Sequence, residues 1–283
     1  MRRIMLVLGG IIVAAVMSTA AMAAERWLDI PNPPTMPKAV ESGMAEVNGI
    51  KMYYAIYGKG SPILMIHGGL GHGDLWANQV KVLMTSHKVV VADSRGHGRS
   101  TRDKQGYSYA LMASDYLALL DKLGIKKTAL VGWSDGGIIG LDIAIHHPER
   151  LTKLFAHAAN ATTDGVDPAV EKNATFGLYV ERMAADYSKM SPTPKQFNGF
   201  VEQISHMWAT LPAYTKAQVA SIKVPTAIVL GDHDEAITRK HTDYLASTIP
   251  GAKLIILKSV SHFAMLQDPE GYNKAILDFL DGS

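Results

Sequence analysis

The sequence predicts an α/β fold built on a mostly parallel sheet. Short apolar runs at residues 62–66, 89–92 and 128–131 alternate with helical patterns of about a dozen residues, as in βαβ units. These runs are apolar almost throughout, which is typical of strands covered on both faces. The 283 residues suffice for one large core with an inserted lobe, and 47% hydrophobic with 19% charged residues is typical of a globular protein.

The N-terminal residues 1–23 have the pattern of a secretory signal peptide. Two arginines at positions 2 and 3 precede an apolar stretch, and Ala21-Met22-Ala23 has the small-residue spacing of a cleavage site, which predicts a cut between Ala23 and Ala24. An apolar stretch of about 14 residues is shorter than the roughly 20 that a spanning helix needs. The arginine pair alone gives little support to a twin-arginine route. We therefore expect an exported protein, periplasmic or secreted, without a stable membrane span in the mature chain.

The composition narrows the possible chemistry. The chain contains no cysteine, which excludes a lipoprotein anchor, a disulfide, a thiol nucleophile and a cysteine-ligated metal. Without the two leader arginines, 26 basic residues face 26 acidic ones, so no nucleic acid partner is expected. We expect neither a metal nor a cofactor.

Residues 24–40 and 41–57 predict an extended arm followed by a hairpin. Four prolines lie between positions 31 and 37, which favours an extended arm over the surface (or a mobile one) rather than a helix. Two β-prone runs, 44–47 and 50–57, flank Asn48-Gly49, a strong hairpin signal.

The next strands each lead into a polar loop. The run 62–66 precedes the loop 67–73, the run 89–92 precedes the loop 93–100, and the run 128–131 leads into the turn at Ser134. A helix between the second and third loops is predicted to begin at a Ser108 cap and stop at Gly124. Because ligands of parallel sheets bind beyond the carboxyl ends of the strands, we expect these loops to converge.

After a strand predicted at 154–159, the alternation is interrupted. Residues 161–219 show aromatic residues at helical spacing and no buried-strand run, which predicts a helical cap whose aromatics mostly pack its own core. Strands return at 224–230 and 254–257, and an amphipathic helix closes the chain near 275–280. The predicted core comprises residues 41–160 and 220–283.

Ser134 is the predicted nucleophile. It lies in Gly132-Trp133-Ser134-Asp135-Gly136, between a predicted strand and a predicted helix, and G-x-S-x-G in that context is the pattern of a nucleophile elbow. A serine hydroxyl needs a base within hydrogen-bond reach, and histidine suits that role near neutral pH.

The order nucleophile, acid, histidine predicts Asp234 and His262 as the other catalytic residues. His262 follows the last strand; three further histidines also follow strands, namely His67, His97 and His233. His67 is expected to hold its loop, His97 lies in a turn and His233 lies beside the acid. Asp232 and Glu235 compete with Asp234, but Asp232 directly follows the strand and is expected to cap the turn.

Two backbone N–H groups should form an oxyanion hole. One is predicted at Asp135, at the amino end of a helix, and the other at Gly69, with Leu70 as the alternative. Residues expected to contact substrate are Leu70, Trp133, Asp135 and Trp208.

With these motifs assembled, the chain resembles the α/β-hydrolase superfamily over nearly its whole mature length. The matching motifs are residues 62–69, Asp93-x-Arg95-Gly96-x-Gly98-x-Ser100, Gly132 to Gly137, Gly231-x-x-Asp234 and Ser261-His262-Phe263. The resemblance implies an α/β-hydrolase fold: a mostly parallel, eight-stranded sheet flanked by helices, with a small helical cap inserted after the sixth strand. It also implies a Ser-His-Asp triad.

Within that superfamily, Gly132 to Gly137 followed by Ala159-Asn160-Ala161 looks like the valacyclovir hydrolase branch of esterases, and enol-lactone hydrolases are similar in less detail. In that branch the acid after the nucleophile helps to hold an amino group, which would assign that role to Asp135. The other interpretation, which we favour, is that Asp135 complements the helix amino terminus. The signal peptide and the unmatched cap sequence depart from the branch pattern.

These features predict an exported serine hydrolase that cleaves carboxylic esters through an acyl-enzyme, with a small-molecule ester as its partner. Lactone hydrolysis, cleavage of a carbon–carbon bond in a β-diketone and aminopeptidase-like hydrolysis use the same machinery. A serine at the elbow argues against haloalkane or epoxide chemistry, which uses a carboxylate nucleophile. A binding protein on an inactive hydrolase scaffold would have lost a triad residue, and none is lost here. The sequence leaves the oligomeric state open.

Overall fold

The computed structural model describes residues 25–282. The predicted signal peptide, residues 1–23, lies outside this range. Within residues 25–282, no helix combines the length and apolar character needed to cross a membrane.

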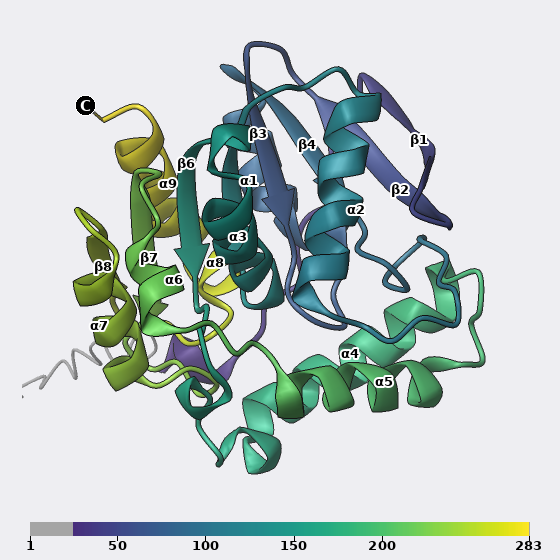
Figure 1. Ribbon diagram of the computed structural model, residues 1–283. Coiled ribbons are helices and arrows are strands. Elements are labelled where there is room, and N and C mark those ends of the chain that lie inside the picture. Colours follow the sequence, from purple (N-terminus) through teal and green to yellow (C-terminus); the bar gives the residue numbers. More distant parts are fainter. Residues whose placement is uncertain (1–24, 283) are drawn as a thin grey trace, which may run out of the picture.

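Eight strands form one sheet in the order β1-β2-β4-β3-β5-β6-β7-β8 (Figure 1). The strands are β1 (Glu41–Val47), β2 (Ile50–Tyr57), β3 (Ser61–Ile66), β4 (His87–Ala92), β5 (Thr128–Trp133), β6 (Leu151–His157), β7 (Thr226–Gly231) and β8 (Lys253–Leu257). Only β1 and β2 pair antiparallel to their neighbours, whereas β3 to β8 run parallel. The mostly parallel eight-stranded sheet predicted from the sequence is confirmed.

The local sequence explains where the strands turn or end. Asn48 and Gly49 both have positive φ angles, 41° and 81°, as the tight turn between β1 and β2 requires. Every residue of β5 is buried, in keeping with its apolar sequence. The sixth strand lies earlier than the predicted 154–159: it ends at His157 because Ala158 adopts a φ of 52°, which is incompatible with a strand.

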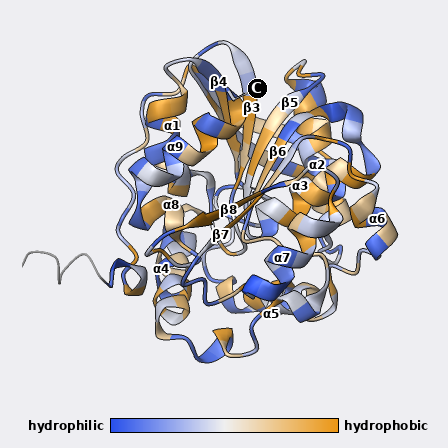
Figure 2. Cartoon of the chain, turned by 90° about the vertical axis from the view of Figure 1, so that its left-hand side faces the viewer, coloured by the Kyte–Doolittle hydropathy of each residue, from blue (hydrophilic) through white to orange (hydrophobic). Residues whose placement is uncertain are grey.

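Helices cover both faces of this apolar sheet (Figure 2). They are α1 (Ala77–Leu83), α8 (Ala264–Gln267) and α9 (Pro269–Leu280) on one side, and α2 (Tyr109–Lys122), α3 (Asp135–His146) and α6 (Lys216–Ala220) on the other; α7 (Arg239–Thr248) follows β7. The Ser108 hydroxyl caps α2 by accepting the Leu111 N–H at 3.1 Å, and Gly124 takes the positive φ, 67°, just after that helix.

Two long helices, α4 (Ala174–Met190) and α5 (Phe197–Thr210), lie across the carboxyl ends of the strands (Figure 1). Each buries one face at helical spacing: Tyr179, Met183 and Tyr187 from α4, and Phe200, Ile204 and Met207 from α5. The rings of Tyr187 and Phe200 stack with centroids 5.3 Å apart. These contacts join the two helices into a small helical cap.

The close approach of α3 to β3 sets a first prediction. A Cβ on Gly136 would lie 2.1 Å from the Ile66 carbonyl oxygen, whereas a Cβ on Gly177, on the exposed side of α4, would meet nothing within 4 Å. We expect Gly136→Ala to lower the free energy of unfolding by roughly 3 kcal/mol, because the added methyl group can be accommodated only if the backbone at Ile66 or in α3 shifts. Gly177→Ala should raise it by about 0.5–1 kcal/mol.

Urea unfolding of the two variants beside the unmodified chain measures both changes. Equal stabilities for the two variants would contradict the proposed steric contact between α3 and β3.

Candidate functional site

Ser134 occupies a strained turn between β5 and α3. Its φ and ψ are 55° and −121°, a conformation that an L-residue adopts only where its surroundings impose it. The Ser134 N–H donates to the His157 carbonyl at 2.8 Å, and the Ile138 N–H donates to the Ser134 carbonyl at 3.0 Å. Side chains at the flanking glycines would not fit, since a Cβ on Gly132 would lie 2.2 Å from the Gly136 oxygen. The turn thus has the geometry of a nucleophile elbow.

His262 and Asp234 face each other across the ends of β8 and β7. The His262 Nδ1 atom lies 3.1 Å from both carboxylate oxygens of Asp234. Asp234 Oδ1 also accepts the N–H groups of Ala236 and Ile237 at 2.9 and 2.8 Å. Because a carboxylate accepts, Nδ1 carries the proton, which leaves Nε2 of His262 as the basic nitrogen.

This pair is buried, and its charges support each other. Burial alone would raise the pKa of Asp234, but His262 and the Ile237 N–H outweigh it, so that the pKa lies below its usual value. Burial alone would lower the pKa of His262, but the carboxylates of Asp234 and Glu235 outweigh it and the pKa is raised. The arrangement stabilises an imidazolium at His262.

The competing acids have other partners. Glu235 accepts the backbone N–H of His262 at 3.0 Å, and so supports the main chain of that residue. Asp232 accepts the Val260 N–H at the longer distance of 3.4 Å. The structure therefore brings Asp234, rather than its two neighbours, to the imidazole of His262.

His67 orients the peptide of the predicted oxyanion donor Gly69. Its Nδ1–H donates to the Gly68 carbonyl at 2.7 Å, and its Nε2 accepts the Ser94 N–H at 2.9 Å, which fixes a neutral tautomer. The Gly71 N–H also donates to the Gly68 carbonyl, at 3.1 Å. Because that carbonyl shares a peptide plane with the Gly69 N–H, these two bonds fix and polarise the Gly69 donor.

The cap holds both predicted oxyanion residues. The Tyr179 hydroxyl, from α4, donates to the Gly69 carbonyl at 2.8 Å. The Trp208 Nε1–H, from α5, donates to both carboxylate oxygens of Asp135 at 3.0 Å. Asp135 is the first residue of α3, where a backbone N–H has no partner within the helix. Leu70, the alternative donor, follows with a φ of 63°.

The Asp135 carboxylate is buried, and its hydrogen-bond partners within residues 25–282 are neutral donors. Besides Trp208, it accepts the Tyr109 hydroxyl at 2.9 Å. Burial raises the pKa of Asp135 to about 6, although the bonds from Trp208 and Tyr109 act in the opposite direction. This side chain ties α2 and the cap to the turn that carries Ser134.

Of the other residues expected to contact substrate, Trp133 and Leu70 are deeply packed and Trp208 is not. Trp133 is 1% exposed, and its ring centroid lies 5.5 Å from that of His262 and 5.6 Å from that of Tyr179. Leu70 is 3% exposed. Trp208 is half-buried, and its indole edge would meet a Cβ on Gly69 at 2.3 Å. Of these, Trp208 lies directly against the oxyanion loop.

The Asp93 motif builds the neighbouring loops. The buried Asp93 carboxylate accepts the N–H groups of Gly73 and Arg99 at 2.7 and 2.8 Å. Arg95 makes two hydrogen bonds, of 2.9 and 2.8 Å, to the carboxylate of Asp115 on α2. These bonds fix the loop that donates the Ser94 N–H to His67.

Sequence reasoning missed three side chains at this site: His157, Tyr109 and Tyr179. His157 ends β6, is fully buried, and lies 6.4 Å from His262 between ring centroids. Its burial lowers its pKa to about 3. The carboxyl end of a strand was an available signal for His157. No local sequence pattern could have indicated Tyr109 or Tyr179, because the residues that they bind are distant in sequence.

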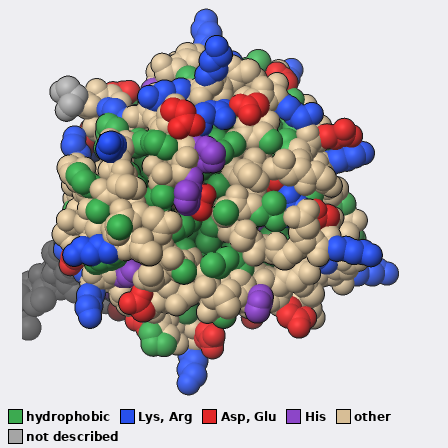
Figure 3. Space-filling view, in the orientation of Figure 1, with side chains coloured by type: hydrophobic (Ala, Val, Ile, Leu, Met, Phe, Trp, Pro, Cys, Tyr) green, Lys and Arg blue, Asp and Glu red, His purple; other side chains and the backbone are tan. Residues whose placement is uncertain are grey.

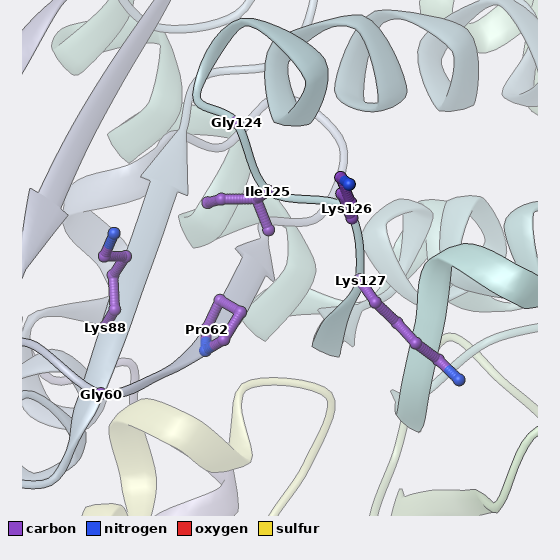
Figure 4. A pocket seen from close by; sticks show the side chains of 7 residues that line it. All are labelled: Gly60, Pro62, Lys88, Gly124, Ile125, Lys126 and Lys127. Atoms are coloured by element: carbon purple, nitrogen blue, oxygen red, sulfur yellow. The ribbon is translucent and has the colours of Figure 1, made fainter.

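Two cavities lie away from Ser134, and neither is lined by a predicted catalytic residue. One, of about 330 Å³, lies at the amino ends of β3, β4 and β5 (Figure 4) and is lined by Gly60, Pro62, Lys88, Gly124, Ile125, Lys126 and Lys127. The other, of about 290 Å³, is lined by Ser108, Tyr109, Ala110, Asp142, His146, Leu211, Pro212, Ala213, Tyr214 and Gln218. Tyr109 thus separates the second cavity from Asp135.

Charged side chains are spread over the face seen in Figure 3, and hydrophobic and histidine side chains lie nearer its centre. Within residues 25–282, no three His, Asp or Glu side chains are grouped so that they could hold a metal ion.

Comparisons with known proteins show which proteins this chain resembles. A family model described as alpha/beta hydrolase fold matches residues 61–199. A RutD protein of Pseudomonas savastanoi pv. phaseolicola, named for carbamate hydrolysis, is 28% identical over 244 residues, 78% of this chain and 94% of the relative. The human serine hydrolase BPHL is 29% identical over 257 residues, 86% of this chain and 87% of the relative. A solved N-acyl homoserine lactone degrading enzyme is 29% identical with a TM-score of 0.72, covering 84% of this chain and 100% of that chain.

The buried, neutral His67 makes stability depend on pH. Burial lowers its pKa from 6.5 to about 4, so between these pH values the unfolded state binds more protons than the folded state. The contribution of His67 is complete above pH 6.5 and decreases as the pH falls toward 4, by up to about 3 kcal/mol. Urea unfolding between pH 7.5 and pH 4.5 measures this loss.

His67→Gln should be less stable at pH 7.5 but should lose less stability on acidification. His206→Gln, a substitution of an exposed histidine on α5, serves as the matched control. Parallel pH curves for the His67 variant and the control would contradict the assignment.

Proposed function

This chain belongs to the α/β-hydrolase fold family, and we propose that it is an exported serine hydrolase that cleaves carboxylic esters through an acyl-enzyme. The observations that carry the proposal are the strained turn at Ser134 and a buried His262–Asp234 pair with both Nδ1–O distances at 3.1 Å; the ring of Trp133, directly before the serine, lies 5.5 Å from that of His262 between centroids. A partly exposed serine on such a turn has no evident structural use.

In this proposal, Ser134 Oγ attacks the ester carbonyl carbon and His262 Nε2 takes the hydroxyl proton. Asp234 holds the imidazole and stabilises the imidazolium. The N–H groups of Gly69 and Asp135 stabilise the oxyanion. The imidazolium then gives its proton to the departing alcohol. In the second step, water attacks the acyl-enzyme while His262 takes a proton from the water, and His262 returns that proton to Ser134 Oγ as the carboxylic acid leaves.

Replacing Ser134 tests the nucleophile. We expect Ser134→Ala to lower kcat for p-nitrophenyl esters by about 10⁵-fold or more, because the covalent step is lost. Ser188→Ala, at an exposed position on α4, is the matched control and should keep full activity. Mass spectrometry after fluorophosphonate treatment should locate the adduct on Ser134. Full ester hydrolysis by Ser134→Ala, or an adduct on another residue, would overturn the proposal.

Lactone hydrolysis is the second candidate, because a lactone is a cyclic ester and the lactone-degrading structure shares 29% identity and a TM-score of 0.72 with this chain. The RutD relative adds carbamates to the candidate substrates. Product analysis on matched linear esters, lactones and carbamates separates the three, and a β-diketone tests carbon–carbon cleavage. Release of amino acids from peptide amides without ester turnover would indicate the aminopeptidase-like alternative.

We further propose that the Asp135 carboxylate serves the fold around the nucleophile rather than an amino group of the substrate. The hydroxyl of Tyr109 and the indole N–H of Trp208 already bind this carboxylate, and Asp135 is 5% exposed. An ammonium group would compete with these two donors for the same oxygens.

Asp135→Asn distinguishes the two roles. Because the raised pKa of Asp135 means that the folded state binds the proton more tightly, stability falls as the pH rises from 3.8 through about 6. An amide keeps an acceptor oxygen without the charge, so unfolding at pH 8 should cost up to about 3 kcal/mol more in the variant. The ratio of kcat/KM for aminoacyl and neutral esters should not change; a selective loss with aminoacyl esters would show that the carboxylate binds the amino group.

We propose an exported protein, periplasmic or secreted in its mature form, because residues 1–23 have the sequence pattern of a leader. Expressed from its own start in a bacterium with two membranes, the chain should be recovered by osmotic shock or from the medium, beginning at Ala24. A chain without residues 2–23 should remain in the cytoplasm. Recovery of the unprocessed chain from the cytoplasm would contradict the proposal.

A further inference from the structure

A short N-terminal segment lies against the loop of His262, the loop of Asp234 and the cap. We propose that this segment, residues 26–31, holds these three parts in their working positions and so positions the catalytic residues. We call residues 26–31 the strap. The inference rests on the proposed catalytic role of His262.

Arg26 attaches the strap to the start of the His262 loop. Its Nε–H donates to the Ser259 carbonyl at 2.9 Å, and its Nη2 donates to the Lys258 carbonyl at 3.0 Å. The same nitrogen lies 3.1 Å from the Asp268 carboxylate, which caps α9. Ser259 has a φ of 56°, so the loop makes an unfavourable turn where Arg26 binds it.

Gln267 joins the strap to the residue directly before His262. Its buried Nε2 donates to the carbonyls of Asp29 and Trp27 at 2.8 and 3.2 Å and to the Ser261 hydroxyl at 2.9 Å. Its Oε1 accepts the Ser261 N–H at 2.7 Å. One amide therefore fixes the strap and the backbone of Ser261 together. If the strap were absent, this buried amide would lose two acceptors, at a cost in free energy.

Trp27 connects the strap to the loop of the acid. Its ring lies flat on the ring of His233, with centroids 3.8 Å apart and an angle of 2° between the planes. His233 directly precedes Asp234, and its N–H donates to the Val260 carbonyl at 3.0 Å. The stack covers the point at which the loops of Asp234 and His262 are hydrogen-bonded to each other.

The far end of the strap binds the cap. Arg182 of α4 donates to the carbonyl of Ile30 and, at 3.2 Å, to that of Pro31. Ile30 is itself 3% exposed. Tyr179 lies one turn before Arg182 on the same helix and binds the Gly69 carbonyl. The strap thus reaches the oxyanion loop through α4, as well as the histidine and the acid.

Gln267 and Arg182 bind backbone carbonyls of the strap, so the strap must hold one shape, which is a short 3-10 helix at Arg26–Leu28 followed by residues 29–31 without regular structure. Pro31, the last residue of the strap, and Pro33 and Pro34, just beyond it, restrict the chain before it docks, which lowers the entropy lost on docking. Arg26 would be the third residue of the mature chain if the leader is cut before Ala24. The strap would therefore lie at the mature N-terminus.

Trp27→Ala tests the inference, with Trp27→Phe as the conservative variant that can still stack on His233. Val40→Ala, at a 72% exposed position in the same arm, is the matched control. We expect Trp27→Ala to lower kcat for a p-nitrophenyl ester by about tenfold with little change in KM, because misplacing His262 affects the transition state more than substrate binding. Trp27→Phe should recover most of this loss.

Hydrogen exchange provides a readout that does not depend on activity. In Trp27→Ala, the amides of residues 258–263 should exchange faster than in the unmodified chain or in Val40→Ala. Arg182→Ala, with Arg182→Lys as its conservative variant, provides a second test from the cap side should Trp27→Ala not fold; it should lower kcat and speed exchange near Gly69.

An unchanged kcat in both Trp27→Ala and Arg182→Ala, beside an active unmodified chain, would overturn the inference while leaving the proposed function intact. If the unmodified chain hydrolyses no ester, lactone or carbamate, the proposed function fails. The rate of amide hydrogen exchange at residues 258–263 then decides whether the strap holds this loop. The same rate in Trp27→Ala and in the unmodified chain would overturn the inference as well.

Discussion

The backbone at Ser134 has a φ of 55°, and the surrounding structure is built so that this conformation can persist. Such a turn is unfavourable for a serine unless neighbouring contacts impose it. Here β5 is buried throughout and α3 packs against β3. The two flanking glycines lie so close to neighbouring backbone that no side chain would fit at either position. Packing on both sides of the sheet offsets the strain, so the conformation of this partly exposed serine depends on the whole parallel core.

The same core shifts the pKa values of its buried histidines in opposite directions. His67 and His157 are buried without a carboxylate bonded to the ring, and burial lowers their pKa values to about 4 and about 3. His262 is equally buried, but Asp234 and Glu235 raise its pKa. One fold therefore holds a neutral imidazole that orients a backbone donor and another that can accept a proton.

The cap does more than cover the serine, because it also binds the groups around the predicted oxyanion hole. Tyr179 binds the Gly69 carbonyl and Trp208 binds the Asp135 carboxylate, each from a different cap helix. Movement of either helix would disturb both the wall of the site and the donors that stabilise developing charge. The contacts of Arg182 with the backbone at Ile30 extend this coupling to the N-terminal arm.

By itself, the sequence determined the parallel sheet, the hairpin at Asn48-Gly49, the Ser108 cap and the turn at Ser134, because each depends on neighbouring residues and on the spacing of apolar ones. Chain order pointed to Asp234 and His262, but only the tertiary structure decided which acid faces the imidazole. The packed structure likewise decided the partners of Asp135, the burial of His157, the role of Tyr179 and the docking of the arm. Those contacts join segments far apart in the chain, so no local pattern records them.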